Sequence, residues 1–392
     1  MEKLTVNPFC ATQLQILIII DALDECQDKK PTYALLSVLS RYMDKIPLVK
    51  FFITGRPELR IHSGFCQKSL QPHTEVLRLH EVKPSLVDSD IKLFLKSQFL
   101  DIAENQSDCS LEEDWPGQHS IDILCKKAAR FFIYASTVIK FISSNHYLPD
   151  ERLALIVSLP QDTSHEGRSG IDLLYTQVLE QAFHSVDPND PSPYSHFKSV
   201  VGAVVLAFNP FSIRTLSDLM GNHNTSLQNL HSVLLVPENE EHPVQTFHKS
   251  FTDFLADHTR CTNYYFFIDP SIHHKEILLT CLSLIKGRLK RNIHGLNDWV
   301  DLRVIEDLHK LRAVHIGNAL EYASRFWASH LAKVSTGSHI VEELDKAIDE
   351  FFKTSFLFWI EVLILTENLN VGVYALNSIE WYTLVSCGQS FQ

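Results

Sequence analysis

The chain has 392 residues, of which 45% are hydrophobic and 21% charged, the composition of an ordinary globular protein with about two or three domains. Its 35 lysines and arginines against 47 aspartates and glutamates give a formal net charge of -12, which argues against non-specific nucleic-acid binding. The most apolar late segment, residues 356–365, contains Glu361 and is far shorter than the roughly 20 residues of a membrane span. The 8 cysteines are dispersed and no signal peptide is present, so we expect reduced thiols in a cytoplasmic protein.

The first predicted element is a strand over residues 14–20, a run that is apolar except for Gln15 and that three acidic side chains follow. Such a run predicts a strand buried on both faces, as in the centre of a parallel sheet. Open α/β sheets bind their ligands at the carboxyl ends of the strands, where these acids fall. Asp21 suits a Mg²⁺ ion that binds a phosphate, and Asp24 or Glu25 suits the orientation of an attacking water.

A second strand is predicted over residues 48–54, and it runs into the sequence Gly-Arg-Pro-Glu at residues 55–58. Between the strands, residues 33–44 are apolar at helical spacing and long enough to form the crossover helix of a βαβ unit. The alternative for the first strand is a plain core strand with acidic residues in its turn. Two motifs in register favour the ligand-binding interpretation over this alternative.

These segments resemble known motifs. Four apolar residues, Asp21, a small residue, an apolar residue and then Asp24 and Glu25 resemble the Walker B motif of NACHT-type NTPases, which belong to the STAND class of signalling ATPases and GTPases. Residues 48–58 resemble the sensor 1 segment of the fungal members with nephrocystin-like NACHT domains. The resemblance implies Mg²⁺ and ATP or GTP as cofactors, Asp21 as metal ligand, Asp24 and Glu25 as catalytic residues, and Arg56 as a nucleotide contact.

The phosphate-binding loop of such NTPases is missing from the sequence, which nowhere contains Gly-x-x-x-x-Gly-Lys followed by Ser or Thr. In the family this loop lies upstream of Walker B, whereas residues 1–11 resemble only the helix and turn that precede the Walker B strand. We therefore expect a chain that begins partway through its nucleotide-binding domain. A truncated gene model, a degenerate paralogue and a real short form remain alternatives. A chain truncated in this way could also bind no cofactor.

The resemblance also implies a domain order. Residues 1–85 match the last part of the NTPase core, with a further short strand predicted at residues 75–79, and residues 86–160 match the helical lid domain. Within the lid, residues 121–142 are apolar nearly all round and resemble the helical segment that packs beside the NTPase core in the family. Arg130 departs from the family there, because relatives often have a small residue at that place.

Residues 159–170 are polar and rich in turn formers, which predicts a linker. The following segment, residues 171–268, resembles a winged-helix domain, which in STAND proteins regulates the nucleotide state and does not usually read DNA. Helices followed by two strand-like segments carry this resemblance; the helices are predicted at residues 171–183, 197–208, 213–220 and 227–235, and the strands at 233–236 and 243–247.

Residues 248–255, His-Lys-Ser-Phe-Thr-Asp-Phe-Leu, form a third motif. It resembles a segment of NACHT winged-helix domains whose histidine contacts the nucleotide phosphate in the closed, diphosphate-bound state. An imidazole can donate a hydrogen bond to a phosphate oxygen, so His248 is a candidate nucleotide contact. The alternative is that His248 only caps or packs at the turn into a helix.

Residues 269–392 are predicted to be entirely helical, with helices at residues 273–291, 299–312, 318–334 and 341–365. The fold expected for the whole chain is an α/β fragment, a partial parallel sheet of a P-loop NTPase, followed by mostly α-helical regions that include a winged-helix domain. The leading functional hypothesis is a fragment of a NACHT signalling switch whose ATP or GTP hydrolysis is lost without the phosphate-binding loop. The competing hypothesis is a non-enzymatic module that binds protein partners, either itself or full-length relatives, and keeps a vestigial NTPase motif.

Overall fold

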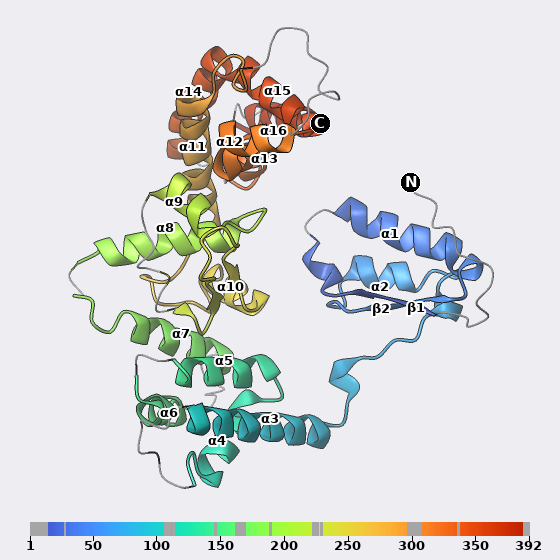
Figure 1. The fold of residues 1–392 in the computed structure, drawn as a ribbon, viewed down its shortest axis with the longest axis vertical. Helices are drawn as coiled ribbons and strands as arrows, with labels where there is room; N and C mark the ends of the chain where they lie inside the picture. Colours follow the sequence, from blue (N-terminus) through green and yellow to red (C-terminus); the bar gives the residue numbers. More distant parts are fainter. Residues whose placement is uncertain are drawn as a thin grey trace. The chain divides into compact units, whose positions relative to one another are not determined.

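The computed structural model describes most of the chain (Figure 1). It divides into two compact units, residues 1–82 and residues 83–392. The described part is mostly helical and contains a small parallel sheet of two strands in the first unit. The described residues are 15–26, 29–105, 111, 114–144, 147–160, 170–187, 190–221, 227, 230–295, 308–334 and 338–386.

The first unit is a βαβ arrangement with one further helix. Its main elements are β1 (Ile16–Ile20), α1 (Lys29–Tyr42), β2 (Val49–Ile53) and α2 (Leu59–Phe65). The two strands pair in parallel, with Ile18 opposite Phe51, and α1 makes the crossover between them. The predicted strands and crossover helix are therefore confirmed, because a parallel pair requires a long connection and the sequence between the strands has helical spacing.

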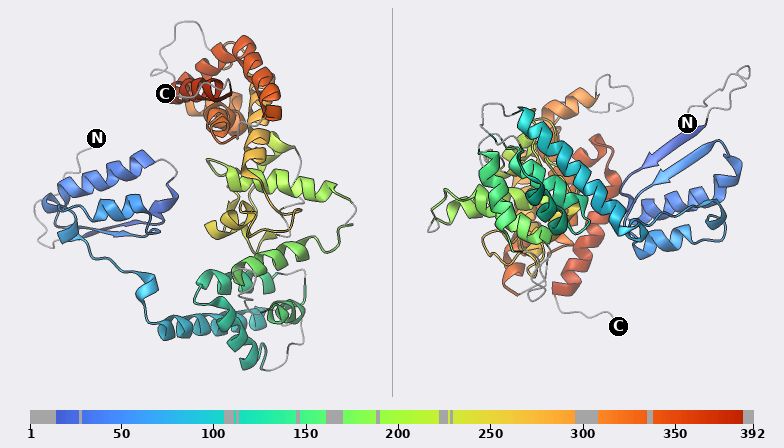
Figure 2. Two further views of the ribbon diagram at one scale, coloured as in Figure 1. Left: turned by 180° about the vertical axis from the view of Figure 1, so that it is seen from behind. Right: turned by 90° about the horizontal axis from the view of Figure 1, so that it is seen from below.

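Helices α1 and α2 pack against each other and cover one face of this sheet (Figure 2). The small core on that face consists of Leu36, Leu39 and Leu70, with Phe51 and Ile53 of β2 packed against it. On the opposite face Leu17, Ile19 and Phe52 are 60%, 66% and 57% exposed. The prediction that the first strand is buried on both faces is therefore wrong for this structure, since the described part of the unit covers only one face.

The strand predicted at residues 75–79 is also wrong. Residues 74–78 have no regular secondary structure, and the 3-10 turn η4 (Leu79–Glu81) follows them. Val76 and Leu77 are 58% and 78% exposed. Alternation of apolar and polar residues gave the prediction, but a strand also needs a neighbour with which to pair its backbone, and among the described residues this segment has none.

The second unit begins with a bundle of five helices. Its longest helix, α3, buries Ile91, Leu95 and Phe99 at four-residue spacing, and it packs on α4 and α5. Helix α5 also contacts α6 and α7, so it lies at the centre of the bundle. The helices are α3 (Pro84–Asn105), α4 (Gln118–Ala128), α5 (Phe132–Ile142), α6 (Pro149–Ser158) and α7 (Gly170–Ala182).

The apolar segment over residues 121–142 forms α4 and α5, with a sharp break between them. Ala129 and Arg130 have φ values of 46° and 68°, the left-handed region that ends a helix. Glycine adopts this conformation without strain, whereas Ala129 and Arg130 carry the steric cost of a Cβ atom there. Apolar residues continue through the break, so the hydrophobic pattern alone does not reveal it.

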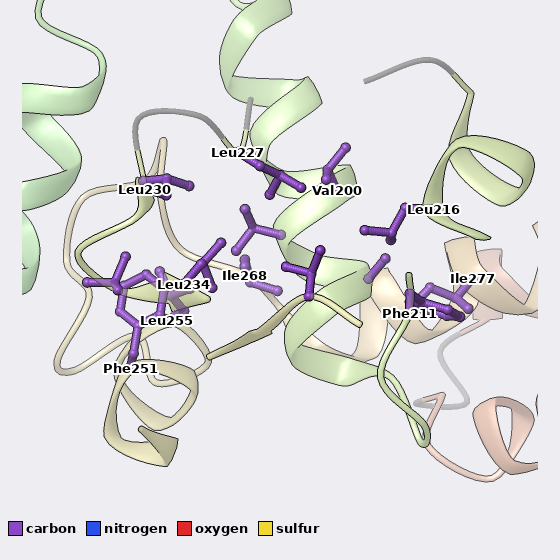
Figure 3. Close-up of a cluster of buried hydrophobic side chains, with 14 of the residues drawn as sticks. Val200, Phe211, Leu216, Leu227, Leu230, Leu234, Phe251, Leu255, Ile268 and Ile277 are labelled. Atoms are coloured by element: carbon purple, nitrogen blue, oxygen red, sulfur yellow. The ribbon is translucent and has the colours of Figure 1, made fainter. Parts of the chain in front are cut away.

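A second layer of helices and a short hairpin follow. Strands β3 and β4 pair antiparallel, with Leu234 opposite Thr246, and the Ser212 side chain caps α9 by accepting a hydrogen bond from the Thr215 backbone N–H at 3.1 Å. Figure 3 shows the buried side chains that α8, α9, α10 and α11 share with this hairpin. The elements are α8 (Ser192–Leu206), α9 (Ile213–Met220), β3 (Leu234–Leu235), β4 (Gln245–Thr246), α10 (Lys249–Leu255) and α11 (Pro270–Arg288).

The helix predicted over residues 227–235 lies partly outside the described residues, and its described part is not helical. Residues 230–233 form a turn that leads into β3. The apolar residues Leu230, Val233 and Leu234 are all buried, so the segment satisfies its hydrophobic pattern as a turn and a short strand instead of a helix.

The last part of the second unit is helical, as predicted. Helix α13 contacts α11, α15 and α16, and Trp359 of α15 donates a hydrogen bond from its Nε1 to the Ser324 carbonyl at 2.8 Å. The helix predicted at residues 341–365 is divided at Ser355, and residues 299–307 of another predicted helix lie outside the described part. The helices are α12 (Leu308–His315), α13 (Gly317–Leu331), α14 (Ser338–Thr354), α15 (Phe356–Leu365) and α16 (Leu369–Ser386), the last of which was not predicted.

Candidate functional site

The carboxyl ends of β1 and β2 lie side by side, and the side chains that follow them are linked. Asp21 comes directly after β1, and its Oδ1 accepts a short hydrogen bond from the Thr54 hydroxyl after β2. The same hydroxyl oxygen accepts a hydrogen bond from the Ala22 backbone N–H at 2.9 Å. Thr54 therefore fixes the orientation of the Asp21 carboxylate, which remains exposed at the edge of the sheet.

A left-handed residue turns the chain back toward β2 after Asp21. Ala22 has φ 51° and ψ 49°, and the next residue, Leu23, donates its backbone N–H to the Thr54 carbonyl at 2.9 Å. A small side chain reduces the steric cost of this conformation, which explains the small residue between the acids of the motif. The turn brings Asp24 next to the loop that follows β2.

Asp24 is only 6% exposed, and its carboxylate holds the loop after β2. Its Oδ1 accepts a hydrogen bond from the Arg56 backbone N–H at 2.9 Å, and its Oδ2 lies 3.6 Å from the Arg56 Nε. Gly55 lies close beside this carboxylate, since a Cβ atom built there would be 3.4 Å from Asp24 Oδ1, an ordinary contact distance. The structure thus brings Asp24 and Arg56 together, and the Asp24 carboxylate positions the loop that contains Arg56.

The edge of the sheet therefore presents one exposed carboxylate and one half-exposed guanidinium. Asp21 is exposed, and the Arg56 side chain is 47% exposed although it contacts Asp24. The described residues contain no group of three or more His, Cys, Asp or Glu side chains that could hold a metal ion by themselves. Magnesium usually keeps several waters and takes one or two carboxylates together with substrate phosphates, so one carboxylate beside a hydroxyl fits that ion.

Glu25, the second acid considered for water activation, ends the 3-10 turn η1 (Leu23–Glu25). Only its backbone belongs to the described part of the chain, so its predicted role stays a prediction. Its neighbour Asp24 already uses both carboxylate oxygens in contacts with Arg56. That arrangement suits a positioning role for Asp24 more directly than proton abstraction.

His248 lies in the second unit, at the N-cap of α10. Its Nδ1 accepts a hydrogen bond from the Ser250 backbone N–H at 3.1 Å, and the Ser250 hydroxyl lies 2.7 Å from the same nitrogen. A second hydroxyl, that of Tyr175 in α7, lies 2.7 Å from Ser250 Oγ. The structure therefore shows the capping role of His248, which uses its Nδ1. The proposed phosphate contact would use the other ring nitrogen, Nε2, of this exposed side chain.

A lysine lies close to this histidine. Lys140 of α5 places its Nζ 3.7 Å from the centre of the Phe247 ring, and Phe247 directly precedes His248. Partial burial lowers the pKa of Lys140 below its usual value, because desolvation disfavours the charged form. A cation and an imidazole thus lie near the start of α10.

Sequence reasoning proposed Asp21, Asp24, Arg56 and His248 as site residues, and it did not identify the hydroxyl groups that contact Asp21 and His248 in the structure. Thr54 ends a predicted strand, and its position beside an acid on the neighbouring parallel strand was available from the register. Tyr175 lies 75 residues from Ser250 in the sequence, so only the packing of α7 on α10 reveals that contact.

No helix in the described part of the chain is both long and apolar enough to cross a membrane. No family model matches the chain. No solved structure matches it either. Among curated proteins, the vegetative incompatibility protein HET-E-1 of Podospora anserina is 23% identical over 394 aligned residues, which cover 93% of this chain. The chain spans only 26% of the length of that relative, and this distant similarity suggests a NACHT-like family.

Proposed function

We propose that the chain is part of a NACHT-type signalling switch that changes conformation with its bound nucleotide. The acids after β1, which hydrogen bonds link to Thr54 and Arg56 after β2, carry this proposal, because parallel strand ends are where P-loop NTPases hold Mg²⁺ and phosphate. The spacing of Asp21, Asp24 and Glu25 supports it, as does the similarity to the vegetative incompatibility protein of Podospora anserina.

In the proposed switch, each side chain has its own task. Asp21 binds the Mg²⁺ ion that accompanies a nucleoside triphosphate, and Thr54 holds the carboxylate in place. Asp24 keeps the loop of Arg56 in position, so that the guanidinium reaches a phosphate oxygen. Glu25 orients the attacking water in an intact relative. Bound Mg²⁺ neutralises phosphate charge, and the residues of this chain position the groups around it.

The proposed domain order is a partial NTPase core at residues 1–85, a helical lid at 86–160, a winged-helix domain at 171–268 and a helical region at 269–392. The antiparallel pair of β3 and β4 after α8 and α9 supports the winged-helix assignment. His248, two residues after the end of β4, would donate a hydrogen bond to a phosphate oxygen of a bound diphosphate. Loss of that contact would accompany the opening of the switch.

The chain by itself should not turn over nucleotide. Phosphoryl transfer depends on positioning and charge neutralisation, and the sequence lacks the Gly-x-x-x-x-Gly-Lys segment whose amides and lysine supply most of both. We expect purified residues 1–392 to release no phosphate from ATP or GTP above the buffer rate. Turnover that Asp24→Ala or Glu25→Ala abolishes would overturn this expectation and indicate a complete active site.

A gain-of-binding experiment tests the proposed function itself. The upstream region of a NACHT relative, which supplies the phosphate-binding loop, is fused to residue 1, and Mg²⁺-dependent binding of ATP and GTP is measured by calorimetry. We expect binding that Asp21→Asn weakens at least tenfold, whereas the exposed Asp122→Asn in the second unit leaves it unchanged. Equal affinities for the Asp21→Asn and unsubstituted proteins would contradict the metal role of Asp21.

The second candidate function is a non-enzymatic module that associates with itself or with full-length relatives. The exposed apolar face of Leu17, Ile19 and Phe52 favours it, since an apolar surface of this kind commonly marks a protein interface. Failure of the fused protein to bind nucleotide, together with co-purification of the unfused chain with a full-length relative, would select this alternative. The acidic motif would then be a vestige.

A further inference from the structure

We propose that Tyr175 and Ser250 are positioning residues that hold the His248 imidazole with its proton on Nε2, ready to donate to a phosphate oxygen. This inference rests on the proposed role of His248 as a phosphate contact. The assignment comes from a chain of three side chains, in which Tyr175 OH lies 2.7 Å from Ser250 Oγ and Ser250 Oγ lies 2.7 Å from His248 Nδ1.

The direction of these hydrogen bonds follows from the Ser250 backbone N–H, which can only donate. The Ser250 backbone N–H lies 3.1 Å from His248 Nδ1, and a backbone N–H has no acceptor capacity. Nδ1 must therefore carry a lone pair, which places the proton of the neutral ring on Nε2. With its proton directed at the lone pair on Nδ1, the Ser250 hydroxyl leaves its oxygen as an acceptor, and the Tyr175 hydroxyl 2.7 Å away can donate to that oxygen.

Tyr175 is well suited to remain a donor. It is 1% exposed, and burial raises the pKa of its hydroxyl to about 12, so the proton stays on the oxygen throughout the neutral range. Its ring packs against Phe251 and Phe254 of α10, with ring centres 5.1 and 5.5 Å away. Packing therefore fixes the Tyr175 ring, and its hydroxyl is held beside Ser250 at the start of α10.

A second polar link fixes α7 in the same register on α10 and the turn after it. Asp172, one helical turn before Tyr175, is 3% exposed and accepts hydrogen bonds from Arg260 Nη2 at 2.6 Å and Nε at 3.2 Å. A shift of α7 along this surface would have to break both links. The tautomer of His248 consequently depends on how α7 packs on α10. Through Tyr175, the proposed phosphate contact is therefore coupled to the position of α7 in the second unit.

Protonation of Nδ1 would change this arrangement. A cationic imidazole presents N–H groups on both nitrogens, so Nδ1–H would face the Ser250 N–H and the N-cap of α10 would be lost. The Ser250 hydroxyl contacts the ring at Nδ1, the Tyr175 hydroxyl contacts Ser250, and the Lys140 ammonium lies over the ring of the preceding residue, Phe247. The Ser250 backbone N–H can only donate, so its contact with Nδ1 is satisfied while that nitrogen keeps its lone pair.

The test uses the full chain with ¹⁵N-labelled histidine rings, and His248→Gln assigns the His248 signals. In the unsubstituted protein we expect the nitrogen shifts of an Nε2–H tautomer. Tyr175→Phe removes only the hydroxyl and keeps the ring contacts, so it should raise the population of the other tautomer and shift the titration midpoint of His248. Tyr134→Phe, the same change at a buried tyrosine outside this chain of hydrogen bonds, should do neither.

Inorganic pyrophosphate supplies the second measurement, followed on the His248 ring signals. We expect Tyr175→Phe to weaken the apparent affinity about threefold to tenfold in the unsubstituted background and not at all in the His248→Gln background, measured on backbone amides of α10. A purely structural role would lower the melting temperature equally in both backgrounds. Unchanged tautomer and midpoint in Tyr175→Phe would overturn the positioning role, whereas a correct tautomer with no response to pyrophosphate would overturn the proposed phosphate contact alone.

Discussion

Strand β1 of the first unit and helix α5 of the second are both strongly apolar, yet they are covered very differently. Leu17 and Ile19 of β1 are 60% and 66% exposed, whereas Val138 and Ile142 of α5 are both 0% exposed. Helix α5 has neighbours on several sides, in α3, α4, α6 and α7. Strand β1 pairs with β2 alone among the described residues, and helices cover one face of the pair. An apolar pattern therefore predicts an element, while its burial depends on the partners that the rest of the chain supplies.

Expressing the two units separately is the strongest test of this difference in burial between β1 and α5. Residues 1–82 expressed alone should aggregate, because β1 has an exposed apolar face and an unpaired edge in the described structure, both of which favour association. Residues 83–392 should be monodisperse and unfold cooperatively, since their core is continuous. Light scattering after size-exclusion chromatography provides the measurement, and a monodisperse, cooperatively folded 1–82 fragment would contradict the comparison.

A matched pair of variants sharpens the same test. Leu17→Lys and Ile19→Lys place charges on the exposed face and should reduce the aggregation of the isolated first unit without loss of its parallel pair. Leu36→Lys places the same charge in the small core, where the side chain is 1% exposed, and should unfold the unit. Equal effects of the surface and core substitutions would show that β1 is buried in solution.

Much of the first unit was accessible from the sequence because its signals are local. The two strands, the crossover helix and the acids at the strand ends all depend on residue order within about 45 residues, and one parallel register then brings them together. Thr54, which orients Asp21, follows from that register. The exposed face of β1 could not be predicted in this way. An apolar pattern indicates that both faces can be buried, but it does not show which elements of the chain would pack on the second face.

The second unit shows the opposite limit. Helix α9 begins and ends as predicted, since Ser212 is a recognisable N-cap and Gly221 a recognisable end. The break at Ala129 and Arg130 interrupts a continuous apolar pattern and contains no glycine or proline, so no local signal indicates it. The contact of Tyr175 with Ser250 depends on how two helices pack, and sequence patterns do not determine such packing.

Acidification should destabilise the second unit through a buried pair of histidines. His274 Nδ1 lies 2.7 Å from His330 Nδ1, and His330 Nε2 lies 2.8 Å from the Tyr322 hydroxyl. Burial lowers the pKa of His274 to about 4 and that of His330 to about 3. The unfolded chain takes up protons below its usual histidine pKa of about 6.5 while the folded pair stays neutral, so stability is complete above about pH 6.5 and falls as the pH decreases toward 4.

The expected loss at pH 5 is about 2 kcal/mol for each histidine, relative to pH 7.5. Urea unfolding followed by tryptophan fluorescence is the measurement, because the buried Trp327 and Trp359 report on α13 and α15. His330→Gln should flatten the pH dependence, and His119→Gln at an exposed position should not. An unchanged unfolding midpoint between pH 7.5 and 5 would contradict the neutral pair.

The link between Asp172 and Arg260 predicts a smaller effect. Asp172→Ala leaves Arg260 without its carboxylate, but that arginine is 28% exposed and can reach water, so we expect a loss of about 2 kcal/mol, below the range for a fully buried pair. Asp218→Ala breaks a 3.9 Å pair with Arg288 in which both side chains are nearly half exposed, and it should cost under about 0.5 kcal/mol. Equal losses in the two variants would show that burial does not distinguish these pairs.

The smallest effect separates the two interpretations of His248. In the fused protein that carries a phosphate-binding loop, His248→Ala removes one hydrogen bond to a charged phosphate, worth about 1 to 3 kcal/mol, so diphosphate affinity should fall about tenfold while triphosphate affinity changes little. Lys249→Ala, the neighbouring residue in α10, serves as the control for changes near the helix start. If His248 only caps α10, calorimetry should find equal losses for the two nucleotides and a lower melting temperature. The cap occupies Nδ1 and the proposed contact uses Nε2, so His248→Asn, which keeps a capping oxygen without the Nε2–H, should restore the melting temperature but not the diphosphate affinity.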